Sequence, residues 1–144
     1  KMTTTSIKQT IELIESAIET NFSDEVASVY FDKFTDLEGE KKYPAISYYY
    51  ADSGSQLNLN NNVLSLTFEF LDLISGRNNK NDRRKEVVSD MYDLASRIVQ
   101  HLRQEEGLLI DPSIPPDLFD NRYNNGLGGV EFTLNITMIK PCVI

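Results

Sequence analysis

Two alternating runs of apolar and polar residues constrain the fold of this chain more than any other feature. The first runs from Leu64 to Phe70, and the second begins at Val130. The apolar positions of the second run are Val130, Phe132, Leu134, Ile136 and Met138, and the polar positions between them are Glu131, Thr133, Asn135 and Thr137. A period of two residues is typical of a strand with one buried face and one wet face. Both runs are therefore predicted to be half-buried strands of a sheet.

Two further segments have the apolar spacing of amphipathic helices. Between Ile7 and Thr20, isoleucines recur along one helical stripe, and Ser6 followed by Gln9 forms a capping-box pattern. The segment from Asp82 to Gln104 has a longer stripe, made of Val87, Val88, Met91, Leu94, Ala95, Ile98, Val99 and Leu102. We therefore predict two helices that form a layer against the sheet.

The remaining strand signals are shorter. Further strands are predicted at Val26–Phe34, Ala45–Tyr50, Leu108–Ile110 and Asp117–Asn124. The glycine-rich turn at Asn124–Gly129 leads directly into the last strand, so the segments on either side of it are predicted to form a hairpin. The alternation slips near Leu71, where we expect a β-bulge.

The charge balance of the chain is acidic. It has 22 acidic and 14 basic residues among 144, which gives a formal net charge of −8 at pH 7. Proteins that coat DNA or bind anionic membranes use basic patches, so both roles are disfavoured. A negative surface past which DNA slides without sticking remains compatible with this charge. No apolar stretch has the length of a membrane span, and residues 1–6 are polar, so we expect folding in the cytosol.

No group of residues has the spacing of a catalytic, metal or cofactor site. His101 is the only histidine, and we identify no cysteine or glutamate near it at the spacing of metal ligands. Cys142 is the only cysteine, which excludes an intrachain disulfide. The segment Gly126–Gly129 lacks the Lys-Ser/Thr that follows a phosphate-binding loop. Three aspartates are spaced too loosely for calcium, namely Asp111, Asp117 and Asp120. We expect no enzyme, although a cluster of His101 with a carboxylate in a pocket would reopen that class.

Tyrosines gather on one predicted strand, at Tyr43, Tyr48, Tyr49 and Tyr50. Tyrosines on a sheet can stack on nucleic-acid bases, but no basic residues interleave with these four. Sheet core and subunit contact is the better interpretation, since tyrosine suits sites with one packed end and one wet end. A monomeric binding module that uses this strand and the neighbouring loop for a peptide or sugar is an alternative.

The order of elements resembles that of the small tail-terminator, or tail-completion, proteins of tailed bacteriophages and related contractile systems. The resemblance lies in four segments: Tyr43–Ile46, Leu64–Phe70, the helix that begins with Asp82-Arg-Arg-Lys85, and Gly129–Leu134. It covers nearly the whole chain, although we do not match the connector Asp111–Pro116 to a feature of the family.

This resemblance, together with the patterns above, implies an α+β fold in a single domain spanning residues 1–144. The sheet is expected to be mostly antiparallel, with about four or five strands and two α-helices packed on one face. The family forms hexameric rings that cap the finished tail tube, stop its polymerisation and offer a surface to the neck of the DNA-filled head. The implied partners are other copies of the chain, the tail tube protein and a neck or head-completion protein, with DNA only passing through the channel. The implied location is the virion tail or neck, after assembly in the bacterial host cytoplasm.

Two polar loops, Ala51–Asn62 and Ser75–Asn81, are the natural assembly contacts under this hypothesis. The candidate contact residues are Asp52, Gln56, Asn58, Asn60, Arg77, Asn79, Lys80, Arg83 and Arg84. A neck or head-closure protein, which is a head–tail connector, remains the alternative within the same structural class.

Overall fold

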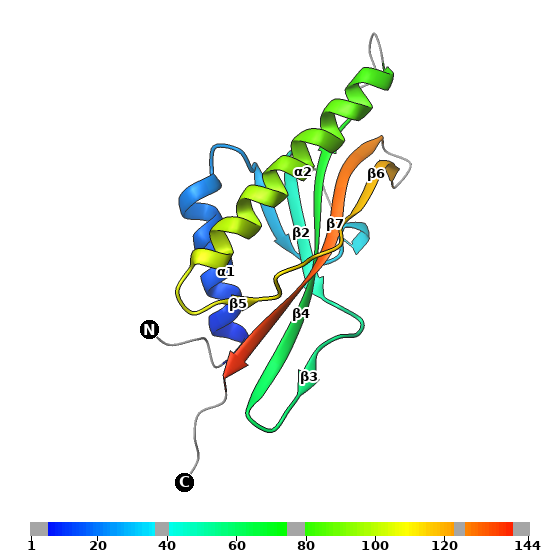
Figure 1. Ribbon diagram of the computed structural model, residues 1–144. Helices are drawn as coiled ribbons and strands as arrows, with labels where there is room; N and C mark the ends of the chain where they lie inside the picture. The colour runs from blue at the N-terminus through cyan, green and yellow to red at the C-terminus, as the bar shows by residue number, and fades with distance from the viewer. Residues whose placement is uncertain (1–5, 37–40, 75–79, 123–125, 140–144) are drawn as a thin grey trace.

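A seven-stranded sheet forms one layer of the molecule and two α-helices form the other (Figure 1). The computed structural model describes residues 6–36, 41–74, 80–122 and 126–139. The helices are α1 (Ile7–Phe22), α2 (Lys80–Gln104) and a short 3-10 helix, η1 (Phe34–Asp36). The strands are β1 (Ser28–Phe31), β2 (Ala45–Tyr50), β3 (Gln56–Leu57), β4 (Asn61–Leu73), β5 (Leu109–Ile110), β6 (Asp117–Arg122) and β7 (Leu127–Ile139).

The strand order is β1-β2-β4-β7-β5, with β3 paired to β4 and β6 paired to β7. Every pair is antiparallel except β1–β2, so the prediction of a mostly antiparallel α+β fold is confirmed. The predicted hairpin between β6 and β7 is also confirmed. The described residues contain more strands than the four or five expected. The strand predicted at Leu108–Ile110 is present as β5, whereas the two-residue strand β3 lies in a predicted loop and is too short for a periodic signal.

The two alternating runs meet at the centre of the sheet. Leu66 lies opposite Leu134, and Phe68 lies opposite Phe132 with the two rings stacked. Both helices contribute to the apolar cluster above this face; Ile14, for example, comes from α1. Helix α2 contributes Val87, Met91, Leu94, Ala95, Ile98, Val99 and Leu102. The helices therefore cover the face of the sheet that the apolar positions of both runs define.

The apolar residue that breaks the alternation, Leu71, belongs to a second cluster on the opposite face. The predicted bulge is wrong, because β4 and β7 stay in register through Leu71, which lies opposite Gly129. Leu71 packs with Phe34 and Leu127, and Tyr43 and Phe119 cover this small cluster. Phe70 and Leu71 are thus both buried, each on its own side of the sheet.

The helix boundaries lie close to the predicted ones. Ser6 caps α1 as expected, and its hydroxyl accepts a hydrogen bond from the backbone N–H of Gln9 at 3.1 Å. Helix α1 continues to Phe22, one half-turn beyond the prediction. Helix α2 begins at Lys80, so Lys80 and Asn81 belong to the helix rather than to the predicted loop. No helix among the described residues is both long enough and apolar enough to cross a membrane.

Candidate functional site

The predicted loop between β2 and β4 forms a projecting β-arm, made of residues 51–65, that extends beyond the helix layer (Figure 1). The polar loop predicted at Ala51–Asn62 contains a short strand, and β4 begins within it. Gln56 and Leu57 pair with β4, while Asn61 and Asn62 already belong to β4. The same stretch of β4 pairs on its other side with the end of β7. Pairing with two strands makes the arm a continuation of the sheet.

Local contacts hold the base and the tip of the arm in one shape. At the base, the Ser55 hydroxyl accepts a hydrogen bond from the backbone N–H of Ser65 at 3.0 Å, and the Ser65 hydroxyl donates to the Asn135 side chain. At the tip, the backbone N–H of Asn58 donates to the carbonyl of Asn61 at 3.1 Å. Gly54 has φ +108°, and a Cβ there would lie 2.7 Å from Ser65 Oγ. The arm is therefore well ordered by hydrogen bonds.

Two leucines at the tip of the arm are almost fully exposed. Leu57 and Leu59 each keep 89% of their accessible surface. The next most exposed large apolar residue, Leu118, keeps 57%. No residue between Ser53 and Ser65 carries a charge, in a chain whose net charge is −8. Paired apolar side chains on an ordered, uncharged projection are typical of a protein–protein contact.

The predicted contact residues fall into two groups at opposite ends of the molecule. Asp52, Gln56, Asn58 and Asn60 all lie on the arm and are exposed. Lys80, Arg83 and Arg84 lie at the start of α2, which extends past the other end of the sheet (Figure 1). Arg77 and Asn79 lie outside the described residues.

Arg83 has an intramolecular role of its own. Its guanidinium donates to the carbonyl of Leu73 at 3.1 Å and lies 3.8 Å from Asp72 and 3.7 Å from Glu86. Arg83 thus ties the start of α2 to the end of β4. On the arm, the polar residues were predicted as contacts, whereas Leu57 and Leu59 between them were not. The uncharged alternation Gln-Leu-Asn-Leu-Asn could have indicated both leucines.

A buried charge cluster lies on the sheet face opposite the helices. Glu69 and Glu131 are cross-strand neighbours, and Glu69 is only 2% exposed. Arg122 bridges them, with its Nη1 2.8 Å from Glu69 and also bonded to Glu131. Burial alone lowers the pKa of Arg122, but hydrogen bonds to Glu131 and Glu69 outweigh it and raise the pKa. Burial, followed by the charges of Glu69 and Glu131, raises the pKa of Tyr49 to about 12, so Tyr49 stays neutral. This cluster joins β6 to the central strands.

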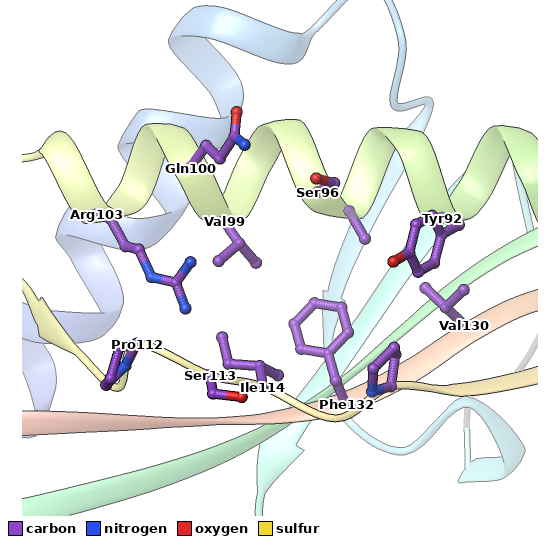
Figure 2. Close-up of a pocket in the computed structure, with 12 residues that line it drawn as sticks. Tyr92, Ser96, Val99, Gln100, Arg103, Pro112, Ser113, Ile114, Val130 and Phe132 are labelled. Atoms are coloured by element: carbon purple, nitrogen blue, oxygen red, sulfur yellow. The ribbon is translucent and has the colours of Figure 1, made fainter.

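A cavity of about 290 Å³ lies between α2 and the connector at residues 112–116 (Figure 2). Figure 2 shows Tyr92, Val99 and Arg103 pointing from α2 toward Ile114 and Phe132. Arg103 donates to the carbonyl of Asp111 at 2.6 Å, which holds the connector in place. The residues that line this cavity include no histidine, cysteine or carboxylate, and their ionisable side chains are those of Tyr92 and Arg103.

His101 lies outside this cavity, at the junction of the two helices. The sequence analysis missed its carboxylate neighbour, Glu105, whose Oε2 lies 3.4 Å from His101 Nε2. The same nitrogen lies 3.0 Å from the amide of Asn21, and the ring packs edge-on against Phe22. Among the described residues, no group of three or more His, Cys, Asp or Glu side chains could hold a metal ion. Cys142 lies outside the described residues.

The four tyrosines do not share one exposed surface, although Tyr50 is exposed beside Phe31. Tyr48 is fully buried, and its hydroxyl donates to Glu15 of α1. Tyr43 and Tyr49 are half-buried, so Tyr50 is the exposed member of the four. The chain matches no known family model, and a search of the curated proteins finds no relative.

Proposed function

We propose that this protein is a structural subunit that forms a ring on the end of a phage tail tube, where it stops polymerisation and presents the surface that joins the head or neck. The observation that carries the proposal is the ordered, uncharged arm with Leu57 and Leu59 exposed at its tip. Exposed leucines on a rigid projection gain free energy when a partner covers them, at about 25 cal/mol per Å² of apolar surface. A subunit of a larger assembly has a partner that can cover these leucines.

The separation of the two contact groups also supports the proposal. The arm lies at one end of the molecule and the basic start of α2 lies at the other (Figure 1). A ring between a tube and a neck needs two different joining surfaces on each subunit. The acidic net charge suits a channel that passes DNA without binding it. The proposed partners are further copies of the chain, the tube protein and a neck protein, in the virion and without a cofactor.

The test is the mass of the protein by light scattering, alone and with preformed tail tubes, followed by electron microscopy of the mixture. We expect a ring at tube ends and shorter tubes when the protein is present during polymerisation. Charge introduced on the arm by Asn60→Lys should reduce ring formation and leave the melting temperature unchanged. Polymerisation that continues past the added protein would contradict the terminator role.

Two other outcomes favour the alternatives. Binding to isolated DNA-filled heads, without binding to tubes, would assign the protein to neck or head closure. A monomer that ignores both tubes and heads would favour a binding module. The observation behind that second candidate is the cavity between α2 and residues 112–116, whose lining is apolar with a few polar groups, as small-ligand sites are.

A further inference from the structure

An exposed apolar groove lies between α1 and the β1 edge of the sheet, and one of its lining residues, Tyr50, pairs with Leu66 at the base of the arm. Its volume is about 520 Å³, and its apolar residues are Ile7 and Ile11 of α1, Phe31 of β1 and Tyr50 of β2. Phe31 packs edge-on against Tyr50, and both remain substantially exposed. We call this surface the edge groove. Strand β1 forms the outer edge of the sheet there, since β2 is its neighbour among the described residues.

We propose that the edge groove is the seat for the arm of a second copy of this chain, with Leu57 and Leu59 inserted beside Phe31 and Tyr50. This inference rests on the proposed ring function and names the contact between neighbouring subunits. The same chain then supplies both halves of the interface. Contacts of this head-to-tail kind close into a ring when the rotation between neighbours allows it.

The acidic residues around the edge groove favour the uncharged arm as its occupant. The α1 side of the groove carries Glu12 and Glu15 beside the single cation Lys8, and Glu19 follows along the same helix. Carboxylates on an incoming segment would meet like charge there. Of the exposed apolar residues outside the groove and the arm, all except Val29, which lies on β1 itself, have an aspartate within two positions: Leu73, Tyr92, Leu109 and Leu118. Leu57 and Leu59 alone among the described exposed leucines lie in an uncharged stretch.

The arm cannot fill the groove of its own subunit. Tyr50 pairs with Leu66 at the base of the arm, whereas Asn61 near the tip pairs with Ile139. At about 3.4 Å per residue, the tip lies roughly 17 Å beyond the base, and pairing on both sides keeps β4 from folding back. An occupant with this chemistry must therefore come from another molecule.

One such contact is too weak to hold an isolated pair. The free energy gained by burying two leucines does not exceed what two molecules lose in translational and rotational freedom when they associate. A closed ring differs because every copy uses both its arm and its groove. We therefore expect dilute protein to be monomeric and rings to form at high concentration or on a tube end.

The test is cross-linking between two single-cysteine proteins, each in a Cys142→Ser background. One carries Leu59→Cys on the arm and the other carries Ile7→Cys in the edge groove. After mixing with tail tubes, a short bis-maleimide reagent should join them. The matched control replaces Ile7→Cys by Leu109→Cys, which is similarly exposed on the opposite sheet edge. We expect at least a tenfold excess of the heterodimer over the control pair.

A second variant separates this inference from the proposed function. Leu57→Asp with Leu59→Asp should abolish rings and cross-links while the melting temperature stays within a degree or two, since neither side chain is packed. Rings that still form on tubes with this variant would overturn the arm contact and leave the terminator role standing. Rings that cross-link as expected but never engage tubes would overturn the terminator role and leave the contact standing. A wild-type protein that stays monomeric at every concentration and on tubes would overturn both.

Discussion

At the scale of single residues, Gly129 shows how closely the two central strands approach. A Cβ at this position would lie 1.7 Å from the backbone oxygen of Phe70, so no other residue fits without moving a strand. The sequence analysis placed Gly129 in a turn, whereas it lies within β7 opposite Leu71. We predict that Gly129→Ala lowers the free energy of unfolding by about 3 kcal/mol, the upper range for overpacking, as measured by urea denaturation.

The matched control at this scale is Gly126→Ala. Gly126 has φ +65°, but a Cβ there would meet its nearest neighbour, the carbonyl oxygen of Ile74, at 3.5 Å. Gly126→Ala should therefore lower the free energy of unfolding only through the left-handed backbone at this position, by about 1 kcal/mol. Equal losses for the two variants would show that the close approach at Gly129 has little weight.

At the scale of elements, Arg122 determines how β6 joins the central strands. Without its guanidinium, Glu69 and Glu131 would face each other across β4 and β7, one of them buried. We predict that Arg122→Leu lowers the free energy of unfolding by about 3–5 kcal/mol, as expected when one partner of a buried ion pair is removed. Chemical denaturation at pH 7 measures the loss. Adding Glu69→Gln and Glu131→Gln should restore most of it, and a triple variant as unstable as Arg122→Leu would contradict this account.

A second ion pair joins the end of α1 to α2. Arg97 binds both carboxylate oxygens of Glu25, at 2.9 and 2.6 Å, and also Asp93. The hydrogen bonds from Arg97 lower the pKa of Glu25 from its ordinary value of 4.5. A lowered pKa means that the pair stabilises the fold above that ordinary value and that this contribution disappears as the pH falls through the folded-state pKa.

We predict that Glu25→Gln lowers the free energy of unfolding at pH 7 by up to about 1 kcal/mol, the range for exposed pairs. The difference from wild type should shrink steadily as the pH drops below 4.5. Denaturation curves across this pH range measure it, with Glu19→Gln as a control on the exposed face of α1. If the difference in the free energy of unfolding grew toward acid pH, the Glu25–Arg97 pair would be excluded as its source.

At the scale of the whole molecule, the net charge of −8 opposes assembly while the proposed contact is uncharged on the arm side. Salt screens repulsion between copies, with a Debye length of about 10 Å at 0.1 M. We therefore predict that ring formation strengthens as salt rises from low concentration to about 0.5 M. Light-scattering mass at fixed protein concentration measures it. Rings that dissociate as salt rises would show instead that opposite charges hold the subunits together.

The sequence by itself determined the identity of the main elements, because periodicity is a local property. Alternation marks the strands around Phe68 and Leu134, and the isoleucine stripe marks α1. The prediction of one wet face is wrong for the strand around Phe68, because every residue from Leu64 to Leu71 is buried. The alternation also predicted that the polar residues of the last strand, such as Glu131, share the face opposite its apolar residues. To predict these features, it is enough to distinguish apolar residues that recur every two positions from those that recur about every 3.6 positions.

Only the tertiary structure decided where those elements reach and what they leave exposed. Strand β4 extends into the predicted loop because β7, more than 70 positions away in the chain, supplies its hydrogen bonds at Asn61–Val63. Leu71 is buried because Phe34 and Leu127 meet it on the second face. Leu57 and Leu59 are exposed because no described side chain covers them. Each of these outcomes depends on partners distant in the chain, which local patterns do not encode.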